Sequence, residues 1–147
     1  MKNQYCVQEY VYDFAVDGGA QGTIVLSNKD GKAPLPVGAI VKDVTAQVVT
    51  QCTSGGSATV AWGNGDDTDG YTTHGSPIAV ASLTTNALFN ASGLDSALLW
   101  DGTNDHMIPL YIDDTTTGNF SFVIATADLT AGKIVFLVEY LYPGIAV

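Results

Sequence analysis

The stretch Ile134-Val135-Phe136-Leu137-Val138-Glu139-Tyr140-Leu141-Tyr142, or IVFLVEYLY, decides the fold class of this chain. Its β-branched and aromatic residues favour a strand, in which successive side chains point to opposite faces. One face would carry Ile134, Phe136, Val138 and Tyr140, and the other Val135, Leu137 and Leu141. Both faces are therefore apolar, which is typical of a strand buried on both sides or of one that meets another subunit.

The second face of this strand supplies candidate interface residues, namely Val135, Leu137 and Leu141. The chain then ends in an apolar tail that contains Ile145 and Val147, which a solvated terminus would not need. We expect these five side chains to contact another subunit.

Outward from this strand, the chain alternates short strand-like runs with turns rich in Gly, Asp, Asn and Thr. The Thr53-Ser54-Gly55-Gly56 turn predicts a hairpin between two of these runs, 39–50 and 58–62. Residues 84–89 are compatible with one short helical turn. The expected strands are 5–16, with Tyr10, Tyr12, Phe14 and Val16 on one face, and 22–27, 39–50, 58–62, 107–112, 119–126 and 133–142.

This pattern predicts an all-β chain. No apolar stripe with helical spacing continues over three turns, and seven or eight short strands with turn punctuation favour a β-sandwich. A jelly roll is one such arrangement, and we expect at most one or two short helical turns. We expect one domain over residues 1–147, with short arms at 1–4 and 143–147.

The charge balance argues against several partners. The 147 residues carry a formal net charge of -10, with 5 basic residues, all of them lysine. Nucleic-acid binding needs lysine and arginine to replace phosphate counterions, so no nucleic-acid partner is expected. An acidic membrane surface would repel the chain, and no apolar run is long enough to span a bilayer. No secretory signal is expected at the start.

Two cysteines, Cys6 and Cys52, are too few for a disulfide framework and form no metal-binding or redox motif. We expect both to be reduced strand residues. One disulfide between the strands that carry them is the alternative.

The loop GNGDDTDG, residues 63–70, raises the question of a calcium site. An EF-hand with Gly70 at position 6 would place Gly65 at position 1 and Ser76 at position 12, and neither can act as the required ligand. We therefore expect a solvated turn and no metal. An irregular calcium site containing Asp66, Asp67 and Asp69 is the alternative. The segment 113–118 has the same character and is expected to be a hairpin loop.

No catalytic constellation is evident. Neither His74 nor His106 accompanies a serine or cysteine in a recognisable nucleophile motif, and no zinc-ligand spacing occurs. We expect no catalytic residues and no cofactor. Trp62 is in phase with Val60 and is expected in the core. Trp100 is the candidate for stacking on a sugar, since it is followed by Asp101-Gly102.

Several segments together resemble a known family. They are DFAVDGGA (13–20), LPVGAIV (35–41), TSGGSAT (53–59) and LTAGK (129–133) leading into VEY (138–140). Their succession resembles small virion proteins of tailed bacteriophages, of the capsid decoration or cement type. The resemblance spans about residues 10–142, although the stretch 71–105 matches no such pattern.

The resemblance implies a β-sandwich or jelly roll that forms a homo-oligomer, often a trimer, on the outside of the phage head. Such proteins bridge neighbouring major capsid proteins and hold them against DNA pressure. Assembly in the host cytoplasm and the absence of catalytic residues follow from the same resemblance. The alternative is a carbohydrate-binding or adhesive head-fibre or tail module.

Overall fold

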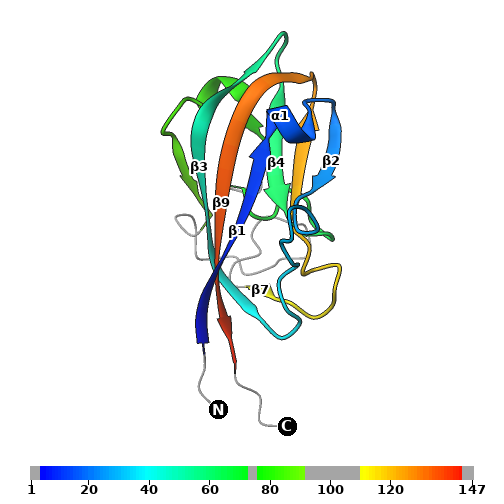
Figure 1. The fold of residues 1–147 in the computed structure, drawn as a ribbon, viewed down its shortest axis with the longest axis vertical. Helices are drawn as coiled ribbons and strands as arrows, with labels where there is room; N and C mark the ends of the chain where they lie inside the picture. The colour runs from blue at the N-terminus through cyan, green and yellow to red at the C-terminus, as the bar shows by residue number, and fades with distance from the viewer. Residues whose placement is uncertain (1–3, 73–75, 92–109, 144–147) are drawn as a thin grey trace.

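The computed structural model describes residues 4–72, 76–91 and 110–143 of the chain (Figure 1). Within them lie two antiparallel sheets, a five-stranded one and a four-stranded one. The elements are β1 (Gln4–Asp13), α1 (Phe14–Asp17), β2 (Gly22–Val25), β3 (Ile40–Ser54), β4 (Thr59–Gly63), β5 (Ile78–Ala79), the 3₁₀ turn η2 (Val80–Ser82), β6 (Leu88–Asn90), β7 (Leu110–Tyr111), β8 (Ser121–Ala125) and β9 (Leu129–Tyr142).

The strand order is that of a jelly roll. The larger sheet has the order β1-β9-β3-β6, with β7 also on β3, and the smaller has the order β2-β8-β4-β5. The four pairs β1–β9, β2–β8, β3–β6 and β4–β5 form one long antiparallel hairpin. Pairing of β9 with β3 and of β8 with β4 rolls this hairpin into two sheets. The predicted all-β sandwich with a jelly-roll arrangement is therefore confirmed.

Aromatic side chains from both sheets fill the core. Tyr10 stacks on Phe120 with ring centroids 4.9 Å apart, and Tyr12 stacks on Phe122 at 4.3 Å. Phe136 of β9 lies 5.2 Å from Trp62, which is buried as the sequence predicted. Burial of such rings contributes strongly to stability, because each removes a large apolar area from water.

The first strand ends earlier than expected. The Asp13 side chain accepts a hydrogen bond from the Ala15 N–H at 3.0 Å and caps the short helix α1. The prediction that Phe14 and Val16 continue the strand face of Tyr12 was therefore wrong. At the other end, Gln4 was expected in the N-terminal arm but is the first residue of β1.

Two further local predictions were wrong. The runs 39–50 and 58–62 do not form a hairpin, because β3 and β4 belong to different sheets and the turn between them carries the chain across the sandwich. The helical turn expected at 84–89 is also absent. Helical geometry occurs instead at Val80–Ser82, while Leu88–Asn90 pairs with β3 as a strand. The described residues contain two short helical turns, α1 and η2, as the sequence predicted.

Candidate functional site

The outer face of the five-stranded sheet, meaning the face turned away from the core, is the candidate site. In β9 the side chains of Ile134, Phe136 and Val138 are buried, so the alternate residues face outward. The strand register then arranges the outer face in four rows across the sheet. The rows are Val11–Val135–Gln47–Leu88, Glu9–Leu137–Thr45–Asn90, Val7–Glu139–Asp43 and Tyr5–Leu141–Ile40–Tyr111.

The outer face exposes large apolar side chains to solvent. Tyr5 is 63% exposed, Val7 55%, Leu88 67%, Tyr111 55% and Leu137 38%. The solvent face of an antiparallel sheet normally carries polar residues, and several exposed large apolar side chains on one face are typical of an interaction site. These side chains occupy both ends of the face, in the first and fourth rows, and its centre.

Carboxylates lie between the two apolar rows. Asp43 is directly opposite Glu139 in the register of β3 and β9, an arrangement of like charges that costs stability. Asp43 accepts a hydrogen bond from the Asn90 amide at 2.7 Å. The interaction of the Tyr5 hydroxyl with the Glu139 carboxylate is the main cause that raises the pKa of Tyr5, and burial is the next. The outer face is therefore apolar and acidic, which suits an apolar and basic partner.

The sequence identified part of this face. Val135, Leu137 and Leu141 all lie on the outer face of β9, where the alternation placed them. Ile145, Val147 and Trp100 lie outside the described residues, as do His74 and His106.

The other exposed residues of the face were missed. Tyr5, Val7, Leu88 and Tyr111 join the face only through strand pairing. For Tyr5 and Val7, the alternation Tyr5, Val7, Glu9 opposite Tyr10 and Tyr12 was a usable signal in the sequence.

The aspartate loop at 63–70 closes on its own hydrogen bonds. The Asn64 side-chain oxygen accepts from the N–H groups of Asp66 and Asp67 at 2.8 and 2.7 Å. The Asp67 carbonyl accepts from the N–H of Asn64 at 2.9 Å and of Gly70 at 3.3 Å. This is the turn geometry expected for Asn and Asp. The expectation that the whole loop is solvated was wrong, because Asn64 is fully buried and Asp67 is buried as well. The loop leads into Tyr71, which is buried against Phe120, and burial raises the pKa of the Tyr71 hydroxyl.

The calcium alternative gains no support from this geometry. Among residues 4–72, 76–91 and 110–143, no three His, Cys, Asp or Glu side chains gather as metal ligands would. Asp66 is exposed and Asp67 is buried, so the three candidate carboxylates do not share one environment. The expectation of no bound metal stays a prediction.

The segment 113–118 likewise forms a turn organised by one carboxylate. Asp114 Oδ1 accepts from the N–H groups of Thr116 at 2.7 Å and Thr117 at 2.9 Å. The hydrogen bonds with Thr117 are the largest cause that lowers the pKa of Asp114. The expected hairpin loop is not one, because the flanking strands β7 and β8 lie in different sheets.

The lowered pKa of Asp114 predicts a pH dependence of stability. The unfolded chain binds the proton more readily, so the contribution of Asp114 is complete above its unfolded pKa of about 3.9 and is lost as the pH falls through the lowered folded value. The difference in unfolding free energy between the native chain and Asp114→Asn should therefore shrink between pH 5 and pH 3. Urea unfolding at several pH values measures it. A constant difference would contradict this account.

The two cysteines are free thiols. Cys6 pairs with Tyr140 in the register of β1 and β9, while Cys52 lies opposite the stretch 131–133 of the same strand. Along β9, about eight residues separate Tyr140, the partner of Cys6, from the residues opposite Cys52. At about 3.3 Å per residue the two cysteines are roughly 26 Å apart, whereas a disulfide needs Cα atoms within about 7 Å. The disulfide alternative is therefore excluded within one chain. Burial raises the pKa of the Cys52 thiol to about 11.

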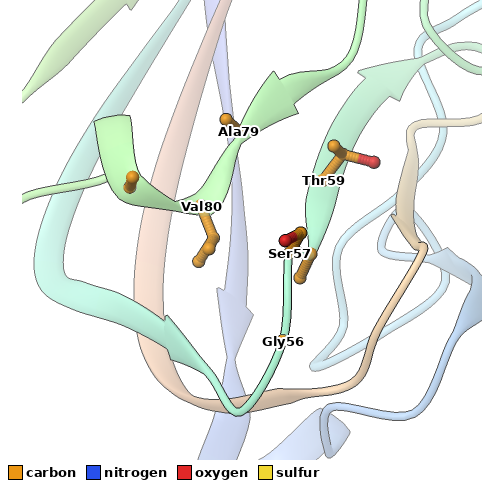
Figure 2. A pocket seen from close by; sticks show the side chains of 7 residues that line it. Gly56, Ser57, Thr59, Ala79 and Val80 are labelled. Carbon is orange, nitrogen blue, oxygen red and sulfur yellow. The ribbon is translucent and has the colours of Figure 1, made fainter.

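A pocket of about 340 Å³ lies beside the start of β4 and the end of β5 (Figure 2). Its walls are small side chains, and its only hydroxyls come from Ser57 and Thr59. Thr59 is already engaged with the Thr126 hydroxyl at 3.1 Å. No acid, base or thiol lines the pocket, so its walls contain nothing that would activate a nucleophile.

No helix in the described part of the chain is long and apolar enough to cross a membrane.

Comparison with known proteins finds no matching protein-family model and no matching curated protein. Solved structures do match. A chain of the cyanophage Pam1 capsid asymmetric unit has a TM-score of 0.57 and 17% identity, over 96% of this chain and 86% of that chain. A chain of the capsid of Ralstonia phage GP4 has a TM-score of 0.49 and 15% identity, over 98% of this chain and 86% of that chain. A chain of the acid-stable capsid of Helicobacter pylori bacteriophage KHP30 has a TM-score of 0.47 and 20% identity, over 99% of this chain and 97% of that chain. The likeness to the Pam1 chain shows a shared fold and confirms the stated resemblance at that level.

Proposed function

We propose that the chain is a non-enzymatic structural protein of a phage particle, which decorates the capsid exterior and bridges neighbouring major capsid proteins. The observation that carries this proposal is the apolar and acidic outer face of the five-stranded sheet. The fold shared with a chain of the Pam1 capsid asymmetric unit supports it. The jelly roll also recurs in viral shell domains.

The proposed mechanism is mechanical. The outer face would be buried against other subunits, with Leu137 at its centre and Val135 and Leu141 on either side along β9. Stable interfaces bury roughly 800 Å² on each partner. Repetition over a capsid lattice adds avidity to contacts that are individually weak. The tail residues Ile145 and Val147 would extend the same contact.

We propose a homotrimer as the assembly. In a closed three-fold ring each subunit presents two different patches to its neighbours, and the outer face of the five-stranded sheet would supply one of them. Such an assembly would form in the host cytoplasm, before or during attachment to the head. No cofactor and no catalytic step belong to the mechanism, since it needs only complementary surfaces.

Leu137→Asp tests the outer face. In particles that lack this protein, rebinding of purified Leu137→Asp should be at least about tenfold weaker than that of the native chain, because it places a charge between Glu9 and Thr45 in an apolar contact. Occupancy is measured by quantitative mass spectrometry of purified particles. The control is Val25→Asp, because Val25 is 43% exposed on β2 of the other sheet.

Two results would count against the proposal. If the native chain is missing from purified particles, the virion role is wrong. If Leu137→Asp binds as well as Val25→Asp, the outer face is not the contact, although the virion role stands.

A further inference from the structure

The strand β1 forms the free edge of the five-stranded sheet. Among the described residues it pairs with β9 alone, over Gln4–Asp13, without a bulge. In Figure 1 its first half reaches beyond the body of the sandwich, next to the last residues of β9. An edge of ten residues is long enough to accept another strand, and natural proteins usually protect such an edge.

The hydrogen bonds of β1 show which backbone groups point to the open side. The Asp13 N–H donates to the Asp17 carboxylate at 2.8 Å, so it does not pair with β9. Backbone groups alternate between the two sides in an antiparallel strand. The N–H and C=O groups of the odd-numbered residues therefore point away from β9, and those of Tyr5 and Val7 are among them.

The second half of this edge is blocked by side chains. The Lys29 ammonium donates to the Val11 carbonyl at 3.2 Å, and the Gln8 amide donates to the Glu9 carbonyl at 3.2 Å. The Asp17 carboxylate accepts from the Asp13 N–H in the same way. Side chains therefore bond outward-pointing backbone groups of residues 9, 11 and 13. This is a common way of preventing unwanted strand pairing.

The first half of the edge has no such protection among the described residues. Within residues 4–72, 76–91 and 110–143, no side chain bonds the backbone of Tyr5 or Val7, and both side chains are exposed and apolar, at 63% and 55%. The two halves of β1 therefore differ. Side chains cover the backbone groups of residues 9–13, and this cover ends where the exposed apolar residues Val7 and Tyr5 lie. An edge with free backbone groups and apolar side chains is what strand addition requires.

We infer that the edge at Tyr5 and Val7 takes up an extended, basic segment of a second protein, which pairs with β1 as an added strand. This deepens the proposed function and rests on it, since the second protein would be a shell subunit. The four backbone groups of Tyr5 and Val7 would bond the segment. On the outer face, its side chains would alternate between an apolar residue beside Val7 and a lysine or arginine near Glu9 and Glu139.

Charge favours such a segment over a second copy of this chain. Glu139 forms no ion pair among the described residues, and Glu9 has only the Lys32 ammonium at 3.7 Å. A copy of β1 would bring Glu9 and no cation of its own to this part of the edge. A basic segment supplies the opposite charge.

Amide hydrogen exchange of the isolated chain tests whether the edge is open. By alternation, the amides of Tyr5 and Val7 should exchange at least about tenfold faster than those of Cys6 and Gln8, which face β9. Slow exchange at Tyr5 and Val7 in a monomer would overturn the inference. Protection that rises with protein concentration would show that a second copy occupies the edge, which would also overturn it.

Rebinding to particles that lack this protein tests the occupant. Val7→Pro removes the outward N–H without removing a bond to β9, and should weaken rebinding at least about tenfold. Val25→Pro is the matched control. The Leu26 N–H bonds the carbonyl of Phe120, the residue before β8, so by alternation the Val25 N–H also points to an open edge. Val7→Lys keeps the N–H but adds a charge that repels a basic segment, and should weaken rebinding too. Circular dichroism confirms that each variant is folded.

The outcomes separate the two proposals. Weak rebinding of Val7→Pro and Val7→Lys, with native rebinding of Val25→Pro, supports strand addition. Equal rebinding of all variants overturns strand addition and leaves the decoration role intact. Failure of the native chain to bind the particles overturns both.

Discussion

Replacing Phe136 with alanine should lower the unfolding free energy by about 3–5 kcal/mol. Phe136 is fully buried in β9. Its ring lies 5.2 Å from Trp62, 5.0 Å from Phe120 and 5.9 Å from Phe122. Trp62 and Phe122 lie in strands β4 and β8 of the other sheet, and Phe120 immediately precedes β8. The cavity would therefore open between the two sheets.

Urea unfolding followed by tryptophan fluorescence measures this loss, because Trp62 borders the cavity. The matched control is Leu137→Ala at the next position of β9, on the outer face, which should cost no more than about 1 kcal/mol. A loss below about 2 kcal/mol for Phe136→Ala would mean that the core can collapse around the missing ring. The central position given to Phe136 would then be wrong.

Replacing Gly63 with alanine should cost about 2–4 kcal/mol, through overlap instead of a cavity. A Cβ at this position would lie 2.0 Å from the Asp67 carbonyl oxygen, 2.6 Å from the Thr68 carbonyl carbon and 2.8 Å from the Asp69 nitrogen. All three are backbone atoms, so no side-chain rotation relieves the overlap. The aspartate loop would have to move away from the end of β4.

Thermal unfolding measures the cost, and amide exchange at Asn64 and Gly70 reports the loop directly, since both N–H groups bond the Asp67 carbonyl. Gly55→Ala serves as the control, because an added Cβ there meets nothing within 4 Å. Native stability of Gly63→Ala would show that the loop rearranges freely, and the close packing described for it would be incorrect.

The strands were predictable because alternation along one strand records which side chains are buried. Ile134, Phe136 and Val138 of β9 were placed on the core side from sequence, and the structure buries all three. The partners of each strand were not predictable in this way. The turn at Gly55-Gly56 suits a hairpin as well as a crossing to the other sheet. Only the long-range pairing of β3 with β9 decides between them.

Local polar chemistry explains the other differences. The apolar alternation of Tyr10 and Tyr12 continues through Phe14 and Val16, but the carboxylate of Asp13 caps a helical turn and ends the strand. The site was predictable only in part for a related reason. Val135, Leu137 and Leu141 stand out within one strand, whereas Leu88 and Tyr111 become part of the face only when β6 and β7 pair with β3.

The pairing of the first strand with the last has a consequence for how the protein is made. Residues 4–13 find their partner only in residues 133–142, so a ribosome must add about 120 more residues after completing β1. At about 5–20 residues per second, β1 waits for roughly 6–24 s before β9 exists. Contacts of such long sequence separation also fold slowly. The jelly roll therefore closes only after β9 has been made, and chains that lack β9 expose both edges of β1 to whatever strand they meet first.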